Sequence, residues 1–318
     1  MIDLVTIGET MISLVPRVSD NVRYGTEFIM RIAGAESNTA IGVQKLGHTA
    51  GWIGRIGNDD FGQYVLRMIR AEGVDTSQVT TDREHQTGIM FKGFSQAFGS
   101  YVNYYRDLSA ASFMEPSVIH EKYIANARIL HLTGITPLLS SSCYKTLRYA
   151  TGIAKAGRTL ISFDPNIRFK LWKEQDHSDM LKEFISLSDI LLIGLEEADY
   201  LFHENDVDKL VKLLFSSYSL QYIAIKDGKN GAWVSDQKAT HYIPPVKCRS
   251  IDSIGAGDAF NAGFLSGLLE GRDLEICGKM GGISGAHATE STGDIEGLLS
   301  KNDMADILNN NKIHFLSR

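Results

Sequence analysis

The chain has 318 residues, 43% of them hydrophobic and 22% charged, and its formal net charge is −6. This acidic balance disfavours a general binder of nucleic acid or of anionic membranes. No apolar run is long enough to span a membrane and the start does not resemble a signal peptide, so we expect a cytoplasmic protein. Three isolated cysteines predict neither a disulfide framework nor a zinc site.

Short apolar or β-branched runs alternate with amphipathic segments of helical length along the chain. The runs predict strands at 2–8, 49–57, 127–134, 159–166, 189–194 and 221–228. The clearest predicted helices are 36–47, 61–74 and 142–157. Such alternation gives a mostly parallel sheet with helices on both faces. The fold class is therefore α/β, and we expect a single domain over residues 1–318.

Two segments interrupt this alternation and predict β-hairpins. They are residues 10–31 and residues 86–106, and in the second the stretch SQAFGS supplies the turn. Hairpins inserted at the strand ends would cover the cleft in which open α/β sheets bind ligands. We therefore expect a small β-hairpin lid.

Glycine-rich turns occur at 33–40, 54–62, 225–233 and 252–260. In the last turn, glycines precede Asp258 at a helix start, where free N–H groups and the helix dipole attract anions. Taken alone, Asp258 is typical of a helix cap, and glycine turns are commonly structural. Neither G-x-G-x-x-G nor G-x-x-x-x-G-K-[ST] is present, which disfavours a dinucleotide-binding dehydrogenase and a P-loop enzyme.

Two longer stretches carry a family resemblance. AGAESNTAIGVQKLG…GWIGRIGNDDFG and DSIGAGDAFNAGF resemble the two signatures of the ribokinase-like (PfkB) carbohydrate kinases, and the similarity extends over essentially the whole chain. The resemblance implies a three-layer α/β/α ribokinase-like core, ATP as the phosphate donor and Mg²⁺ as a cofactor. A requirement for a monovalent cation stays open. The simple capping explanation for Asp258 becomes the weaker one.

The resemblance assigns phosphoryl transfer to the last glycine turn. Asp258 would take the proton of the attacking hydroxyl. The N–H groups of Gly255, Ala256 and Gly257 would hold the developing negative charge. Arg168 would reach over the cleft toward the substrate or the phosphates, and a surface arginine after a turn is the plain alternative.

For the nucleotide, the resemblance implies contacts from three segments. The residues are Asn166, Arg168, Lys226, Asp227, Gly228, Gly231, Gly255, Ala256 and Gly257. A plain β-turn is the alternative for residues 226–231. Glu197 matches the acid of the family's N-x-x-E motif and would act on Mg²⁺ indirectly, while Gly194 replaces the usual Asn. A solvated acid in a first helical turn is the alternative for Glu197.

Three features are similar to the 2-keto-3-deoxygluconate kinase branch of the family. They are Glu36, a first strand that ends GETM without an aspartate, and the run Tyr104-Tyr105-Arg106. Arginine suits the carboxylate of such a substrate, and alternate residues of a strand share a face, so Tyr104 and Arg106 can enter one pocket. A cross-strand aromatic pair with a solvated arginine is the alternative. The implied substrate-binding set is Gly34, Asn38, Tyr104, Arg106, Arg168, Asp258 and Asp294.

Other substrates and functions stay open from the sequence. Met90 stands where the branch carries an aromatic residue, so fructose and 5-keto-2-deoxygluconate are alternative substrates. An ordinary turn acid is the alternative for Asp294. A catalytically inactive sugar sensor is a further alternative, against which the intact GAGD stretch argues. The expected partners are a sugar acid, ATP and, through the apolar lid, further copies of the chain in a homo-oligomer, with no nucleic acid and no membrane.

Overall fold

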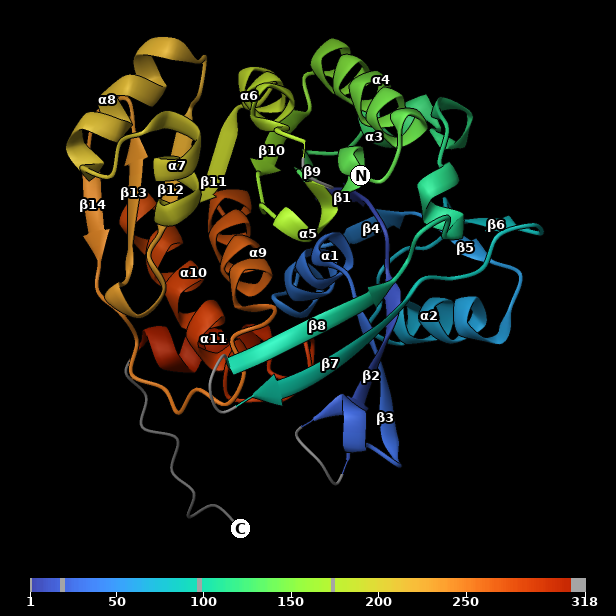
Figure 1. The fold of residues 1–318 in the computed structure, drawn as a ribbon. Coiled ribbons are helices and arrows are strands. Elements are labelled where there is room, and N and C mark those ends of the chain that lie inside the picture. Colours follow the sequence, from blue (N-terminus) through green and yellow to red (C-terminus); the bar gives the residue numbers. More distant parts are fainter. Residues whose placement is uncertain (1, 18–20, 96–98, 173–174, 310–318) are drawn as a thin grey trace.

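The computed structural model is built on an eight-stranded sheet with the order β14–β13–β12–β11–β10–β9–β1–β4 (Figure 1). Its strands are β1 (Leu4–Ile7), β4 (Ala50–Ile53), β9 (Ile129–Thr133), β10 (Leu160–Asp164), β11 (Ile190–Gly194), β12 (Tyr222–Lys226), β13 (Ala232–Asp236) and β14 (Thr240–Ile243). From β12 to β4 the strands are parallel, and β13 and β14 extend one edge in antiparallel pairing. The structure describes the whole chain except residues 1, 18–20, 96–98, 173–174 and 310–318.

Helices cover both faces of this sheet, which confirms the predicted three-layer α/β/α fold (Figure 1). The α-helices are α1 (Ala35–Lys45), α2 (Asp60–Ala71), α3 (Glu121–Ala125), α4 (Ser141–Gly157), α5 (Phe169–Trp172), α6 (Ser178–Ser186), α7 (Leu195–Phe202), α8 (Val207–Ser217), α9 (Ala256–Leu269), α10 (Leu274–Ala288) and α11 (Lys301–Leu308). Short 3₁₀ segments are η1 (Val22–Tyr24), η2 (Ala110–Phe113), η3 (Pro116–Val118), η4 (Thr136–Leu138) and η5 (Gly228–Asn230).

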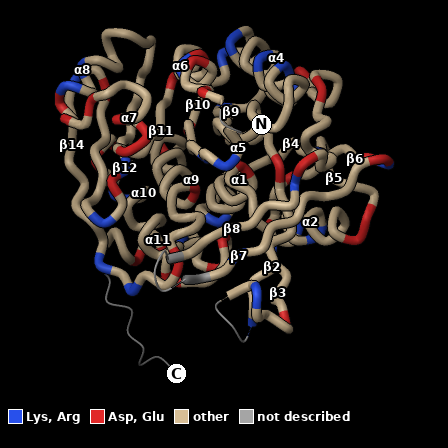
Figure 2. The backbone as a smooth tube through the Cα atoms, viewed as in Figure 1, with Lys and Arg blue, Asp and Glu red and all other residues tan. Residues whose placement is uncertain are grey.

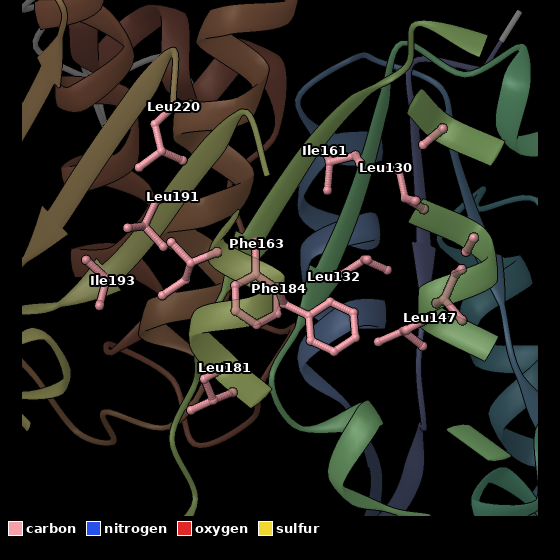
Figure 3. Close-up of a cluster of buried hydrophobic side chains, with 14 of the residues drawn as sticks. Leu130, Leu132, Leu147, Ile161, Phe163, Leu181, Phe184, Leu191, Ile193 and Leu220 are labelled. Carbon is pink, nitrogen blue, oxygen red and sulfur yellow. The ribbon is translucent and has the colours of Figure 1, made fainter. Parts of the chain in front are cut away.

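The core consists of two apolar layers, one on each face of the sheet. Successive side chains of a strand point to opposite faces. Leu130 and Leu132 of β9 therefore pack with Phe184 of α6 in one layer, as Figure 3 shows. Ile129, on the opposite face, belongs to a second layer that includes Phe264 of α9. This arrangement explains why the buried strands are apolar on both faces.

The two segments expected as hairpins together form a second, four-stranded sheet. Its order is β3–β2–β7–β8, with β2 (Met11–Pro16), β3 (Phe28–Ala33), β7 (Ile89–Ser95) and β8 (Gly99–Tyr105). Each segment supplies one antiparallel pair, and parallel pairing of β2 with β7 joins them. Figure 1 shows β7 and β8 crossing in front of α1 and α9. Residues 96–98 of the predicted turn lie outside the described residues.

The run 49–57, predicted as one strand, forms two strands. Gly54 interrupts it, and a Cβ at Gly54 would lie 2.3 Å from Cζ2 of Trp52. Beyond this point β5 (Arg55–Gly57) leaves the main sheet and pairs with β6 (Thr80–Asp82). A run that is continuous in apolar character therefore changes its pairing partner at one glycine.

Acidic and basic positions are interspersed along the backbone (Figure 2). The charged side chains that gather at the site described below therefore do not belong to a larger charged region of the backbone. Within the described ranges, no helix combines the length and the apolar character needed to cross a lipid bilayer.

Helices α1 and α9 approach each other closely on one face of the sheet. A Cβ at Gly42 of α1 would lie 2.5 Å from the Cβ of Ala262 in α9. Asn38 and Asp258 lie about one turn before these two residues on their respective helices. The small residues thus set the spacing at which Asn38 faces Asp258.

We expect Gly42→Ala to lower the midpoint of thermal unfolding, because the added methyl group overpacks the contact between α1 and α9 at a cost of about 1–3 kcal/mol. Gly152→Ala in α4 is the matched control, since a Cβ there would meet no atom within 4 Å. Removing that helical glycine should stabilise the fold by about 0.5–1 kcal/mol. Differential scanning calorimetry measures both, and shifts of the same sign would contradict the packing argument.

Candidate active site

A cleft of about 630 Å³ lies between the lid and the carboxyl ends of the central strands. Its walls come from β8, residues 164–170, Glu197, Lys226 and most of the segment 253–258. The carboxyl ends of parallel strands are where open α/β sheets bind ligands. The sheet, the lid and the start of α9 therefore meet at one cleft.

The glycine turn before α9 supplies free backbone N–H groups to this cleft. Gly255 has φ 87°, a backbone conformation that favours glycine, and a Cβ there would make a tight contact, 3.2 Å, with the carbonyl oxygen of Asp294. Within the described residues, the N–H groups of Gly255 and Gly257 have no acceptor. Ala256 instead donates to the carbonyl oxygen of Ser253 at 3.3 Å and does not line the cleft. The geometry therefore removes Ala256 from the expected set of free amides.

Asp258 is 6% exposed and lines the cleft from the first turn of α9. Its Oδ2 accepts a hydrogen bond from Asn38 Nδ2 at 2.9 Å, and Asn166 Nδ2 lies 3.5 Å from its Oδ1. No side chain caps α9, so the capping explanation for Asp258 does not hold. Burial raises the pKa of Asp258 to about 7, against the opposing effects of the Asn38 hydrogen bond and the Arg168 charge. Near neutral pH this carboxyl group can accept or release a proton.

Asn38 connects Asp258 to a second buried acid. Its Nδ2 also lies 3.4 Å from Oδ2 of Asp294, and its Oδ1 is buried with no hydrogen-bond partner among the described residues. Burial raises the pKa of Asp294. Gly34 does not line the cleft; a Cβ there would lie 2.5 Å from the carbonyl oxygen of Glu9, so Gly34 lets α1 start against the β1–β2 connection.

A second polar cluster lies at the ends of β10 and β12. Lys226 Nζ donates to Asp164 Oδ2 at 2.8 Å and to Asn261 Oδ1 at 3.2 Å. Burial opposes ionisation of Asp164, but the Lys226 charge and the hydrogen bonds outweigh it and lower the pKa. Asn166, two residues after Asp164, has φ 41°, a left-handed conformation that Asn tolerates better than other non-glycine residues. Lys226 thus presents its ammonium group at the cleft while paired with a buried carboxylate.

Glu197 lines the same cleft, but both of its carboxylate oxygens accept backbone hydrogen bonds. The donors are the N–H of Gly194 at 2.8 Å and the N–H of Ile167 at 2.6 Å. Burial, with the neighbouring charge of Asp164, raises the pKa of Glu197. Its position differs from that of a solvated acid in a first helical turn. Within the described residues, no group of three or more His, Cys, Asp or Glu side chains could hold a metal ion.

The turn after β12 reaches the cleft only through its first residue. Lys226 lines the cleft, whereas Asp227, Gly228 and Gly231 do not. The N–H of Asp227 donates to the carbonyl oxygen of Gly231 at 2.9 Å and closes the turn. Gly231 has φ 96°, and a Cβ there would lie 2.2 Å from the carbonyl oxygen of Ile243. Residues 228–230 thus form the short 3₁₀ segment η5 rather than a plain β-turn, and the nucleotide contacts expected of Asp227, Gly228 and Gly231 stay a prediction.

Arg168 and Tyr104 line the cleft, and Arg106 lies just outside its lining. Arg106 is 8% exposed, forms an ion pair with Glu9 and lies over the ring of Tyr104, 5.5 Å from the ring centre. Ser109 Oγ donates to the other oxygen of Glu9 at 2.5 Å. The Arg106 guanidinium is thus neither solvated nor free. Arg168 forms no ion pair among the described residues.

Three charged residues of this region have contacts that the sequence did not predict. Glu36 does not line the cleft, and its buried Oε1 accepts hydrogen bonds from Thr133 and Thr136. Glu9 directly follows a buried strand, which was the one signal that could have found it. Lys92 of β7 is buried between Asp252 and Asp294. A charged residue on the inner face of the predicted lid was the available signal for Lys92.

Comparison with known proteins gives a consistent set of relatives. Residues 1–301 match the family described as pfkB family carbohydrate kinase. The chain is 32% identical to a 2-dehydro-3-deoxygluconokinase from Bacillus subtilis over 96% of this chain and 95% of that protein. It is 28% identical to a 5-dehydro-2-deoxygluconokinase from Bacillus velezensis over 96% and 94% of the two chains. A crystal structure of a PfkB protein from a Polaromonas species superposes with a TM-score of 0.88 at 32% identity, covering 96% of this chain and 99% of that one.

The raised pKa of Asp258 makes stability depend on pH. The folded chain holds this proton up to about pH 7, whereas the unfolded chain loses it near the ordinary value of 3.8. The stability contributed by the proton is therefore complete below pH 3.8 and is lost as the pH rises through about 7. We expect Asp258→Asn to exceed the wild type in free energy of unfolding at pH 8 by up to about 4 kcal/mol, and to approach it at pH 4.

Denaturant unfolding at several pH values measures this difference. Asp208→Asn is the control, because Asp208 is an exposed acid in the first turn of α8. Its effect on the free energy of unfolding should be small at every pH measured, because substitutions at exposed positions change stability little. A pH-independent difference for Asp258→Asn would contradict the raised pKa.

Proposed function

This chain belongs to the pfkB family of carbohydrate kinases, and we propose that it transfers the γ-phosphate of ATP to the terminal hydroxyl of a keto-deoxy sugar acid, with 2-keto-3-deoxygluconate as the leading candidate. The observation that carries the proposal is the position of Asp258. A buried carboxylate with a pKa of about 7 stands beside the free N–H groups of Gly255 and Gly257, in a cleft that also contains Arg168.

In this proposal Asp258 acts as the general base. It accepts the proton of the sugar hydroxyl while the hydroxyl oxygen bonds to the γ-phosphorus and the bond from that phosphorus to the bridging oxygen breaks. Such transition states gain from fixed positive charge and N–H groups around the transferred oxygens. Gly255, Gly257 and Arg168 are placed to supply both. A pKa near 7 lets Asp258 be ionised in a substantial fraction of molecules at neutral pH.

The residues of the cleft fit a nucleoside triphosphate. Two amides at the start of α9 and the guanidinium of Arg168, all without a partner among the described residues, form an anion-attracting wall with the ammonium of Lys226. Mg²⁺, arriving with ATP, would neutralise part of the phosphate charge. Glu197 faces the cleft with both oxygens bonded to backbone N–H groups, which supports an indirect role through water rather than direct coordination. A monovalent-cation requirement stays a prediction.

A sugar acid is favoured by the lid and by two of the relatives. Tyr104 lines the cleft and Arg106 lies beside its ring, on the lid face opposite to the exposed Tyr105. Both named Bacillus relatives act on keto-deoxy derivatives of gluconate according to their names. Met90 pairs with Tyr104 across the lid strands, so the wall of the expected sugar site is thioether and phenol rather than two aromatic rings. The second candidate substrate is therefore 5-keto-2-deoxygluconate.

The outer face of the lid supports the proposed homo-oligomer. The Phe91 ring meets Phe28 and Tyr105 edge-on at 5.4 and 5.5 Å, and Tyr105 is 66% exposed. An aromatic cluster that leaves one ring exposed and the other two half-buried favours association. Sedimentation analysis of the wild type would detect the homo-oligomer. The same measurement on Tyr105→Ser would show whether association depends on the exposed aromatic side chain. The cytoplasmic location stays a prediction.

We expect the purified protein to phosphorylate 2-keto-3-deoxygluconate with the highest kcat/KM in a panel that also contains 5-keto-2-deoxygluconate, fructose and ribose. The reason is that Arg106 of the lid would bind the carboxylate of such a substrate, while Asp258 on the opposite wall would act as the general base. A coupled ADP-release assay measures the panel. Fructose as the best substrate would overturn the choice of a sugar acid.

Asp258→Asn is the control for that panel. Turnover should fall at least about 1,000-fold, because the base is lost, while calorimetric binding of ATP stays within about threefold. A wild type that binds sugar but turns over none of the panel would favour the sensor alternative.

Arg106→Met should raise KM for the acidic sugars about 30- to 100-fold and change kcat little, because a charge-assisted hydrogen bond to the carboxylate is lost. KM for any neutral sugar turned over should change less than about threefold. Glu9→Gln is the matched variant, since it removes the competing carboxylate and leaves Arg106 free for the substrate. If both variants impaired acidic and neutral sugars equally, Arg106 would have only a structural role.

A further inference from the structure

Lys92 is a buried cation that the proposed reaction does not use. It lies on the inner face of β7, is 3% exposed and pairs across the lid with Val102, which lines the cleft. Its ammonium forms ion pairs with Asp252 and Asp294, the latter at 3.1 Å. A buried ammonium is tolerated only when it is paired in this way. The lid thus places one positive charge between two acids of the core.

Each of these acids is connected to a different part of the catalytic apparatus. Asp252 Oδ1 accepts from the N–H of Ile254 and from Ser100 Oγ, both at 3.1 Å, so it fixes the segment directly before Gly255. Asp294 shares the Asn38 amide with Asp258, and its backbone carbonyl lies against Gly255. Lys92 therefore contacts both the acid that fixes the segment before Gly255 and the acid that shares Asn38 with Asp258.

Lys92 is connected to Asp258 through Asp294 and the shared Asn38 amide. Asp294 and Asp164 face Asp258 and raise its pKa, and Arg168 lowers it, after the larger effect of burial. Lys226 is held at Asp164, which leaves Lys92 as the cation paired with Asp294. Without Lys92, two buried carboxyl groups would stand behind Asn38 with no cation between them, so the protonation of Asp294 and the hydrogen bond it accepts from Asn38 would change, and with them the proton affinity of Asp258.

We propose that Lys92 is a positioning residue of this kinase: from the lid it bridges Asp252 and Asp294, so that the charge and the Asn38 hydrogen bond at Asp258 depend on lid docking. The proposal rests on the proposed role of Asp258 as general base. It makes the lid a contributor to the proton affinity of the base and not only a cover for the sugar. Lys92 acts through Asp294 and Asn38 and need not touch either substrate.

The competing explanation is that Lys92 merely tethers the lid. A second tether allows the two to be separated. Arg31 of β3 pairs with Glu296 at 3.2 Å and donates to Thr292 at 3.1 Å, which also ties the lid to the segment around residue 294. Neither partner contacts Asp258. Arg31→Met therefore removes a tether without changing the charge behind Asn38.

Carboxyl-carbon NMR of full-length protein labelled with [¹³C]aspartate tests the proposal without any substrate, with the Asp258 resonance assigned by Asp258→Asn. We expect Lys92→Met to shift the pKa of Asp258 by about one unit, a tenfold change in proton affinity. Lys92→Arg should restore it to within about 0.3 units, and Arg31→Met should leave it unchanged. Asp252→Asn should lower it, because one negative charge is removed while Lys92 remains.

These outcomes decide the question in either direction. An unchanged Asp258 titration in folded Lys92→Met, or an equal shift in Arg31→Met, would overturn the proposal. If Lys92→Met does not fold, Asp252→Asn alone tests the proposal. An unchanged or raised pKa of Asp258 in that variant would overturn it as well.

The kinetic readout is the acid limb of kcat/KM, which reports the free enzyme's base. It should move in Lys92→Met by the same amount and in the same direction as the NMR titration of Asp258, with the largest change in activity at pH 6 and little change at pH 9. Titration of ATP is common to all variants and cancels in the comparison. Absence of turnover on every sugar would count against the proposed function alone, because the NMR titration still reports on Lys92.

Discussion

The hydrogen bond from Asn38 to the buried carboxylate of Asp258 is the interaction on which the site depends. It joins α1 to α9 at the point where both helices begin, and the close contact of Gly42 with Ala262 one turn later holds that spacing. Burial raises the pKa of the acid, and the hydrogen bond limits the rise. A carboxyl group useful as a base near neutral pH therefore follows from how closely two helices pack.

Around this pair, the charged side chains near the cleft are balanced against one another. Lys226 pairs with Asp164, Lys92 with Asp252 and Asp294, and Arg106 with Glu9. Such pairing is required when ionised groups leave water. Arg168 is exposed, faces the cleft and has no acidic partner among the described residues. Its charge is thus available to an incoming anion without first separating from an acidic partner.

Family membership and substrate choice depend on different parts of the molecule. The residues to which we assign phosphate transfer lie in the turn 253–258 and at the strand ends, which belong to the core. The contacts expected to select the sugar come from the lid, where Tyr104, Arg106 and Met90 lie on one face of two strands. Small changes on this face can alter specificity without disturbing the base, which accords with relatives of similar identity that carry different substrate names.

The sequence by itself determined the α/β alternation, both lid segments and the glycine turn that precedes Asp258. These features follow from local rules: apolar periodicity, hairpin spacing, and backbone conformations such as φ 87° at Gly255 that favour glycine. The tertiary structure alone decided that Ala256 bonds within its turn, that Gly54 divides a strand, and that Lys92 meets Asp294 at a separation of 202 residues. The partner of a buried charge depends on which elements the topology brings together, and no local pattern in the chain encodes that distance.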